Sequence, residues 1–232
     1  MGSIQLLDDH TINQIAAGEV IERPASVVKE LVENSLDANA KNIWIRVEEG
    51  GTSLIVIRDD GHGMDKEDAV LAFQKHSTSK IRSFDDLQTV LTSGFRGEAL
   101  PSIASVSETT ITSRTRVDKL ATKIKVSFGE LDHQNVASRD VGTTVKITSL
   151  FQKTPARLKF LKSLRVENSH CKDVFLKMAI SHPQIKFKLN IEGKNIYNFK
   201  KDESNDSISS ERISAAFGYD FIKNSIKIKS ER

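Results

Sequence analysis

Cysteine, proline and aromatic residues are scarce in this sequence. The single cysteine among 232 residues cannot form an internal disulfide, which excludes a disulfide-linked scaffold and fits a reducing compartment. One tryptophan and two tyrosines leave little for a base-stacking surface, so any contact with DNA should be weak, phosphate-mediated and salt-dependent. No apolar run approaches the roughly 18 residues that span a bilayer, and we expect no membrane partner.

The N-terminus and the charge balance further limit the kind of protein this can be. The first six residues lack the cationic and apolar regions of a secretory signal, and Leu6 stands where a myristoylation motif has Ser or Thr. We therefore expect a globular protein that is not secreted, cytoplasmic in a prokaryote or nuclear in a eukaryote. A net charge of +3 does not by itself identify a nucleic-acid binder. One basic series is usually a solvated face, with contact to a DNA backbone as the alternative. It comprises Lys153, Arg157, Lys159, Lys162 and Arg165.

The segment from Pro24 to Asp37 is predicted to be an amphipathic helix. Pro24 suits the first helical turn, where its missing N–H costs nothing. One half of this helix is apolar, and Glu30 and Asn34 lie one turn apart on the other half. The carboxylate could accept a proton from water, and the amide oxygen could ligate a hard divalent cation. The simpler interpretation of the helix alone is a solvated polar face.

Two glycine-bearing turns follow at positions suited to a nucleotide. Asp59 comes directly after an apolar strand, where its carboxylate could accept a hydrogen bond from an exocyclic amine, and the nearby glycines would let the backbone approach a flat ring. The turn 94–97 opens a helix that runs to about residue 106, and a glycine-rich helix N-terminus offers N–H donors to phosphates. Each turn alone is typical of ordinary loops. The helix and the two turns in this order indicate a nucleotide site.

The remaining periodicities predict alternating strands and helices. A short helix is expected over 8–17 with Gly18 as its stop, and a polar connection over 74–97. Strands are expected at 41–48, 52–58, 107–113, 121–127, 143–148 and 225–229, a hairpin turn at 49–51, a hairpin at 185–199, and helices at 66–73, 166–181 and 213–217.

Seven segments closely resemble the N-terminal region of MutL-type DNA mismatch-repair proteins. They are Asn13–Val20, Lys29–Ala38, Asp59–Met64, Thr78–Lys80, Gly94–Leu100, Val141–Thr144 and Thr154–Arg157. The resemblance covers at least residues 4–182. That family shares an ATP site with type II topoisomerases, a heat-shock chaperone and sensor histidine kinases, and no Walker motif occurs here. The implied fold class is α+β: a two-layer α/β sandwich in which helices cover one face of a mixed, mostly antiparallel sheet (the Bergerat-type ATP-binding fold).

The resemblance also implies a role for individual residues. Glu30 would be the general base, Asn34 would hold Mg²⁺ against the phosphates of ATP, and Asp59 would bind the adenine amine. Gly61, Gly63, Met64 and Thr143 would surround the ring. A lid over 74–97 would contain Thr78, Ser79 and Lys80. Phosphate-binding backbone amides would come from Gly94, Phe95, Arg96, Gly97, Glu98, Ala99 and Leu100. Thr143 and Lys80 rest on the resemblance alone.

The function implied by the resemblance is an ATP-driven switch in mismatch repair. Mg-ATP would order the lid and drive association as a homodimer, or as a heterodimer with a paralogue, with slow hydrolysis and a MutS-type partner. Residues 1–203 would form the ATP-binding domain, and 204–232 a linker and the start of a second domain. Because a lysine of that second domain would be lacking, we expect poor hydrolysis. The alternatives are a type II topoisomerase ATPase domain, against which the 95–100 block argues, and a nucleotide-independent DNA-binding module.

Overall fold

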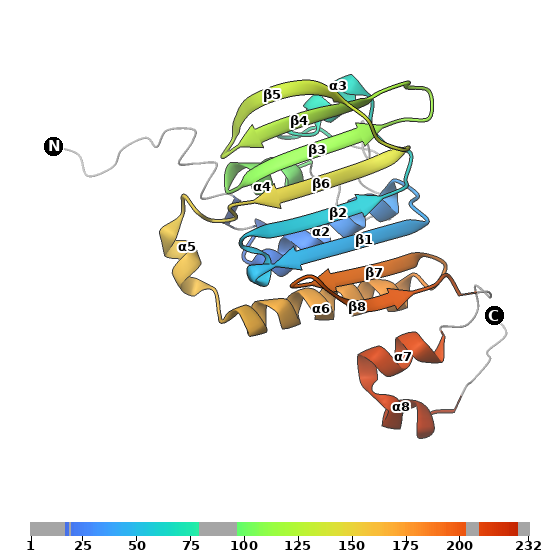
Figure 1. Cartoon of the computed structure of the whole chain (residues 1–232). Helices are drawn as coiled ribbons and strands as arrows, with labels where there is room; N and C mark the ends of the chain where they lie inside the picture. Colours follow the sequence, from blue (N-terminus) through green and yellow to red (C-terminus); the bar gives the residue numbers. More distant parts are fainter. Residues whose placement is uncertain (1–16, 19, 79–96, 203–208, 227–232) are drawn as a thin grey trace, which may run out of the picture.

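The computed structural model describes residues 17, 18, 20–78, 97–202 and 209–226. These residues form two layers, an eight-stranded sheet and a set of helices (Figure 1). The strand order is β5-β4-β3-β6-β2-β1-β7-β8, and every neighbouring pair is antiparallel except β1 and β7. The strands are β1 Asn42–Glu48, β2 Leu54–Asp59, β3 Glu108–Arg114, β4 Ala121–Ser127, β5 Glu130–Ala137, β6 Gly142–Thr148, β7 Lys186–Ile191 and β8 Lys194–Phe199. The expected α+β sandwich with a mixed, mostly antiparallel sheet is confirmed.

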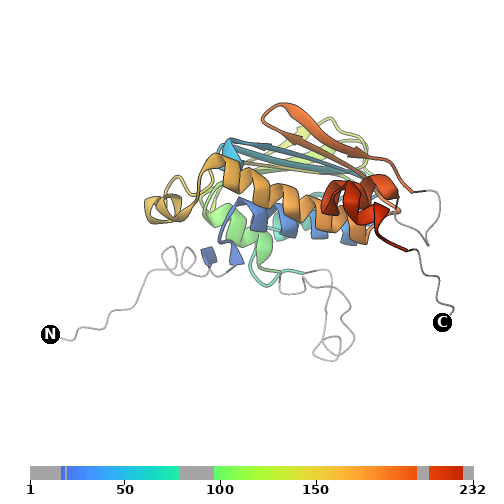
Figure 2. The ribbon, with the colours of Figure 1, turned by 90° about the horizontal axis from the view of Figure 1, so that it is seen from below.

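The helices lie against one face of the sheet, and Figure 2 shows no helix of the described residues on the other face. They are α2 Pro24–Asp37, the 3-10 turn η1 Glu49–Gly51, α3 Lys66–Leu71, α4 Ala99–Ser105, α5 Pro155–Phe160, α6 Leu164–Ser181, α7 Ser210–Phe217 and α8 Tyr219–Lys223. Within the described ranges, no helix is long and apolar enough to cross a membrane.

The alternation of side chains along the strands places the core between the sheet and α2. Ile55 and Ile57 of β2 are buried, as are Val28 and Leu31 of α2. Because successive side chains of a strand point to opposite faces, Asp59 falls on the same face as Ile55 and Ile57, and this face is turned toward α2. The fold thereby buries a carboxylate beneath the C-terminal half of α2.

Several local expectations differ from the structure. Gly18 is itself helical, so its assignment as a helix stop is wrong, and residues 8–16 lie outside the described part. Residues 225 and 226 are not a strand, and 227–229 lie outside the described part. The segment 49–51 forms a 3-10 turn, with Gly50 at φ 63°, rather than a simple hairpin turn. Strand β5 and helices α5 and α8 are absent from the predicted elements, because β5 is almost wholly exposed and the two helices are short and bury no residue.

Helix α7 is held against the ends of α6 and β7 by one buried side chain. Arg212 is fully buried and donates to the carbonyl oxygens of Ala179, His182, Ile185 and Lys200. These carbonyls lie at the C-terminal end of α6 or flank the β7–β8 hairpin, so the guanidinium supplies donors where a helix ends and its last carbonyls lack intrahelical partners. The division of the chain at residues 203 and 204 stays a prediction.

Candidate functional site

The carboxylate of Asp59 is the centre of a buried polar cluster. The residue is 7% exposed. Its Oδ1 accepts the backbone N–H of Gly61 at 2.9 Å and of Thr143 at 3.1 Å, and its Oδ2 accepts the hydroxyl of Ser35 at 3.2 Å. Burial raises the pKa of Asp59 above its ordinary value, although these hydrogen bonds oppose the shift. A carboxylate oxygen has about two acceptor sites, so Oδ2 can accept one more donor.

Two glycines allow the chain to pass closely around this carboxylate. A Cβ on Gly61 would lie 2.7 Å from the carbonyl oxygen of Ala38 at the end of α2. Gly63 has φ 75°, and a Cβ there would lie 2.2 Å from the carbonyl oxygen of Arg114. No side chain fits either position without moving the backbone. The turn after β2 is therefore packed tightly between α2 and the end of β3.

Thr143 and Met64 are joined to the cluster through Ser113. The hydroxyl of Ser113 accepts the backbone N–H of Met64 at 2.8 Å and lies 2.9 Å from the hydroxyl of Thr143. Ser113 and Thr143 are both buried. The structure thus brings Asp59, Gly61, Gly63, Met64 and Thr143 together, although they come from two separate parts of the chain.

Sequence reasoning misses three members of this cluster. Ser35 falls on the apolar half of α2, where a lone hydroxyl among aliphatic residues is a usable signal. Ser113 occupies an inward position of β3 by strand alternation, a weaker signal. Arg139 donates to the carbonyl oxygen of Asp59 at 2.7 Å and to the hydroxyl of Thr144 at 3.0 Å. Nothing in the local pattern around Arg139 indicates this contact.

Glu30 and Asn34 lie on α2, the helix that supplies Ser35. The Glu30 side chain is 22% exposed, and Asn34 is exposed. Glu30 Oε1 accepts Lys29 Nζ at 3.2 Å, and Glu33 accepts the same ammonium at 2.9 Å. Although burial acts to lower it, the pKa of Lys29 is raised by its contacts with Glu33 and Glu30. Both predicted residues can be reached from outside the core, and Ser35 ties their helix to the buried carboxylate.

The predicted phosphate turn is described only in part. Gly97 has φ 63°, and a Cβ there would lie 2.4 Å from the carbonyl oxygen of Ser77, so the two ends of the stretch 78–96 meet. Glu98 is the N-cap residue of α4 and its carbonyl accepts the N–H of Ser102, while Ala99 and Leu100 form the first turn. Thr78 is the last described residue before the gap. The predicted site residues outside the described part are Ser79, Lys80, Gly94, Phe95 and Arg96.

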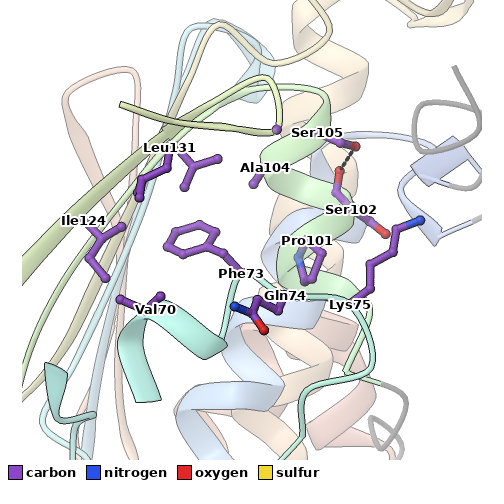
Figure 3. Close-up of a pocket in the computed structure, with 12 residues that line it drawn as sticks. Val70, Phe73, Gln74, Lys75, Pro101, Ser102, Ala104, Ser105, Ile124 and Leu131 are labelled. Atoms are coloured by element: carbon purple, nitrogen blue, oxygen red, sulfur yellow. Dashed lines mark hydrogen bonds between the residues drawn. The ribbon is translucent and has the colours of Figure 1, made fainter. Parts of the chain in front are cut away.

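A cavity of about 290 Å³ lies elsewhere, between α3, α4 and strands β4 and β5 (Figure 3). Val70, Phe73, Ile124 and Leu131 form its apolar wall, and Ser102 and Ser105 lie on α4 at its other side (Figure 3). None of the predicted site residues that the structure describes lines it. Because it adjoins the small apolar cluster around Ala104, we interpret it as a packing void at the edge of the sheet rather than as the nucleotide site.

Comparisons with a family model, with related sequences and with solved structures agree on one family. The model of the family described as histidine kinase-, DNA gyrase B- and HSP90-like ATPase matches residues 21–147. The DNA mismatch repair protein MutL of Heliobacterium modesticaldum is 50% identical over 222 residues, which are 96% of this chain and 33% of that protein. The MutL of Lactococcus lactis is 47% identical over 229 residues, 99% of this chain and 34% of that protein.

A solved structure agrees with these sequence relatives. The ATPase domain of Aquifex aeolicus MutL, complexed with ADP, superposes with a TM-score of 0.67 and 32% identity, covering 85% of this chain and 70% of that one. The chain spans about a third of the length of the curated relatives it matches. On these grounds the chain belongs to the MutL family of DNA mismatch repair proteins and comprises its ATPase domain of the histidine kinase, gyrase B and HSP90 type.

Proposed function

We propose that this chain binds Mg-ATP at the Asp59 cluster and hydrolyses it slowly. The observation that carries the proposal is the buried Asp59 carboxylate, which keeps an acceptor position on Oδ2 while Gly61 and Thr143 hold Oδ1. The N6 amine of adenine is a donor of the right type for that position. Gly63, Met64 and the hydroxyl of Thr143 would border the ring.

The described residues fit a magnesium ion that is held mainly by the nucleotide. No group of three or more His, Cys, Asp or Glu side chains in the described part of the chain could hold a metal ion by itself. Magnesium keeps several waters and is usually bound by substrate phosphates with one or two protein oxygens. The exposed amide oxygen of Asn34 can serve as such a ligand, and the bound ion would offset the charge of the phosphates.

In the proposed hydrolysis, Glu30 orients a water molecule and accepts its proton as the water oxygen attacks the γ-phosphorus. The bond from that phosphorus to the β,γ-bridging oxygen breaks, and ADP leaves with the bonding electron pair. The Lys29 ammonium already touches the Glu30 carboxylate and holds it on the same side of α2 as Glu33. This contact is made by Oε1, so Oε2 of Glu30 is the oxygen that would accept the proton.

The proposed purpose of ATP binding is to gate association. The lid over 74–97 and the N-terminal segment would become ordered around the nucleotide, and two copies, or one copy and a paralogue, would then associate. Hydrolysis would reset this state. In this proposal the assembly relays mismatch recognition from a MutS-type protein and contacts DNA weakly through phosphates.

A single substitution tests hydrolysis and gating separately. Glu30→Ala should reduce single-turnover hydrolysis by about 10²- to 10⁴-fold while ATP affinity and ATP-dependent association persist. Glu33→Ala is the matched control, since Glu33 lies on the same helix and shares Lys29. It should hydrolyse ATP at close to the unmodified rate. If Glu30→Ala no longer binds ATP, Glu30 has a structural role and the proposed mechanism is wrong.

A further inference from the structure

On the face of the sheet opposite the helices, a row of six side chains crosses six strands, and three of them are cations: Lys188, Arg58 and Lys123. In register, Lys188 of β7 pairs with Trp44 of β1, Trp44 with Arg58 of β2, and Arg58 with Thr144 of β6. Thr144 then pairs with Thr112 of β3, which pairs with Lys123 of β4. At about 4.8 Å between strands, the row from Lys188 to Lys123 is about 24 Å long.

A second row runs parallel to the first, two residues further along each strand. Arg46, Val56, Lys146, Thr110 and Lys125 occupy it in strand order. The side chains of both rows point away from the helices, because their sequence neighbours Ile57, Val145 and Ile147 are buried on the helical face. Figure 2 shows this side of the sheet uncovered by any helix of the described chain.

The positive charge of this face is only partly neutralised. Arg46 pairs with Glu48, and Lys125 lies 3.1 Å from Glu108 and 3.2 Å from Asp132. Arg58 reaches only the exposed Asp140, at 3.7 Å, among the residues described. Three lysines make no ion pair with any residue that the structure describes, namely Lys123, Lys146 and Lys188.

Three arginines lie near one another at the middle of the first row: Arg58 belongs to the row, and Arg114 and Arg139 lie beside it. Burial lowers the pKa of Arg139, and the nearby charges of Arg58 and Arg114 lower it further against the opposing effect of Asp59. Mutual repulsion of this kind marks an excess of cations at one place.

We propose that this open sheet face, defined by the two rows from β7 to β4, docks the phosphate backbone of duplex DNA. A duplex carries one charge per 3.4 Å of each strand, so a row of about 24 Å spans about seven phosphates. The side chains between the cations are small hydroxyls, one valine and one half-buried indole, which suits a backbone contact better than base stacking. The surface rests on the proposed DNA contact, but it is separate from the nucleotide site.

The test compares two variants that each remove three positive charges. The sheet variant is Lys123→Gln/Lys146→Gln/Lys188→Gln. The control is Lys159→Gln/Lys162→Gln/Arg165→Gln, which alters exposed cations of the alternative basic series in α5, in the loop after it and at the start of α6. Binding of a short fluorescein-labelled duplex is measured by anisotropy over a series of potassium chloride concentrations, without nucleotide. ATP affinity and thermal unfolding of each variant confirm that the fold is retained.

For the sheet variant, the slope of log affinity against log salt should become shallower by about 0.9 for each phosphate that the protein no longer neutralises, and the control should keep the original slope. The single variants Lys123→Gln and Lys188→Gln should each show one such step, so the result does not depend on the triple variant folding well. Equal reductions of the slope in both triple variants, or a reduction in the control alone, would overturn the assignment to the sheet. If the unmodified chain binds no duplex, the proposed DNA contact fails as well, whereas the ATP proposal is unaffected.

Discussion

Replacing Asp59 with asparagine should separate nucleotide binding from stability. The substitution conserves the size of the side chain, and an amide oxygen can still accept the N–H groups of Gly61 and Thr143. The amide nitrogen then takes the position of Oδ2, so that a donor faces the adenine amine where an acceptor stood. The hydroxyl of Ser35 is also deprived of its acceptor at this position.

The expected decrease in affinity follows from the charge on the acceptor. A hydrogen bond to a charged group contributes about 1.5–3 kcal/mol, and each 1.4 kcal/mol is about tenfold in the dissociation constant. ATP should therefore bind about 10- to 150-fold more weakly to Asp59→Asn. Isothermal titration calorimetry at neutral pH measures this change directly.

The stability of the folded protein should not decrease along with the ATP affinity, and at neutral pH it should stay the same or rise. The pKa of Asp59 is raised in the folded state, chiefly by burial, so the folded protein binds a proton more readily than the unfolded chain. The contribution of Asp59 to stability is therefore lost as pH rises through the folded pKa, and ionised Asp59 opposes folding at neutral pH. The variant should melt no lower than the original protein at pH 7, and the pH-dependence that Asp59 confers should disappear.

Asp60→Asn is the control, because the pKa of Asp60 is lowered whereas that of Asp59 is raised. Asp60 accepts the backbone N–H groups of Lys41 and Asn42, and its pKa is lowered by the bonds from Asn42 despite the opposing effect of burial. Its contribution to stability is present above the unfolded pKa and is lost as pH falls through the folded pKa. The control should lose about 1 kcal/mol of stability at pH 7 and keep its ATP affinity. Unchanged ATP affinity in Asp59→Asn would refute the assignment of Asp59 to adenine.

Three further predictions concern the fold. Arg212→Ala should cost about 3 kcal/mol, because it strips donors from buried carbonyl groups, and chemical denaturation should show no comparable loss in exposed Arg165→Ala. Gly63→Ala should lower the melting temperature by about 4 °C or more, since a Cβ meets the Arg114 carbonyl at 2.2 Å; an unchanged melting temperature would show that the turn can shift freely. Burial raises the pKa of the Cys171 thiol to about 12, so Ellman's reagent at pH 8 should label it only as fast as the protein opens, and rapid labelling of the folded chain would contradict this.

How much of the fold is predictable depends on whether the signal is local. The strands β1 and β2 and the helix α2 agree with their predicted ranges within a few residues, since their burial periods of 2 and 3.6 are written in neighbouring residues. Strand β5 escapes prediction because almost all its residues are exposed, so no alternation of buried and exposed side chains marks it. Helix α5 escapes it because it is short and buries no residue.

The residues of the candidate site also fall into those with a local sequence signal and those without one. Asp59, Gly61 and Gly63 can be named from one turn, whereas Thr143 and Lys80 can be named only from a family resemblance. The role of Lys80 stays a prediction.

The sequence alone determined the polar half of α2, because that follows from residue spacing within one short segment. It determined the two-layer class and the family only through the resemblance of its motifs to MutL-type proteins. Only the tertiary structure decided that Ser35 and Arg139, residues far apart in the chain, both contact Asp59. It also placed on one open face of the sheet three lysines, from three strands, that form no ion pair within the described ranges. Both results depend on strand order and register. These arise from packing between distant segments, so no periodic pattern in neighbouring residues predicts them.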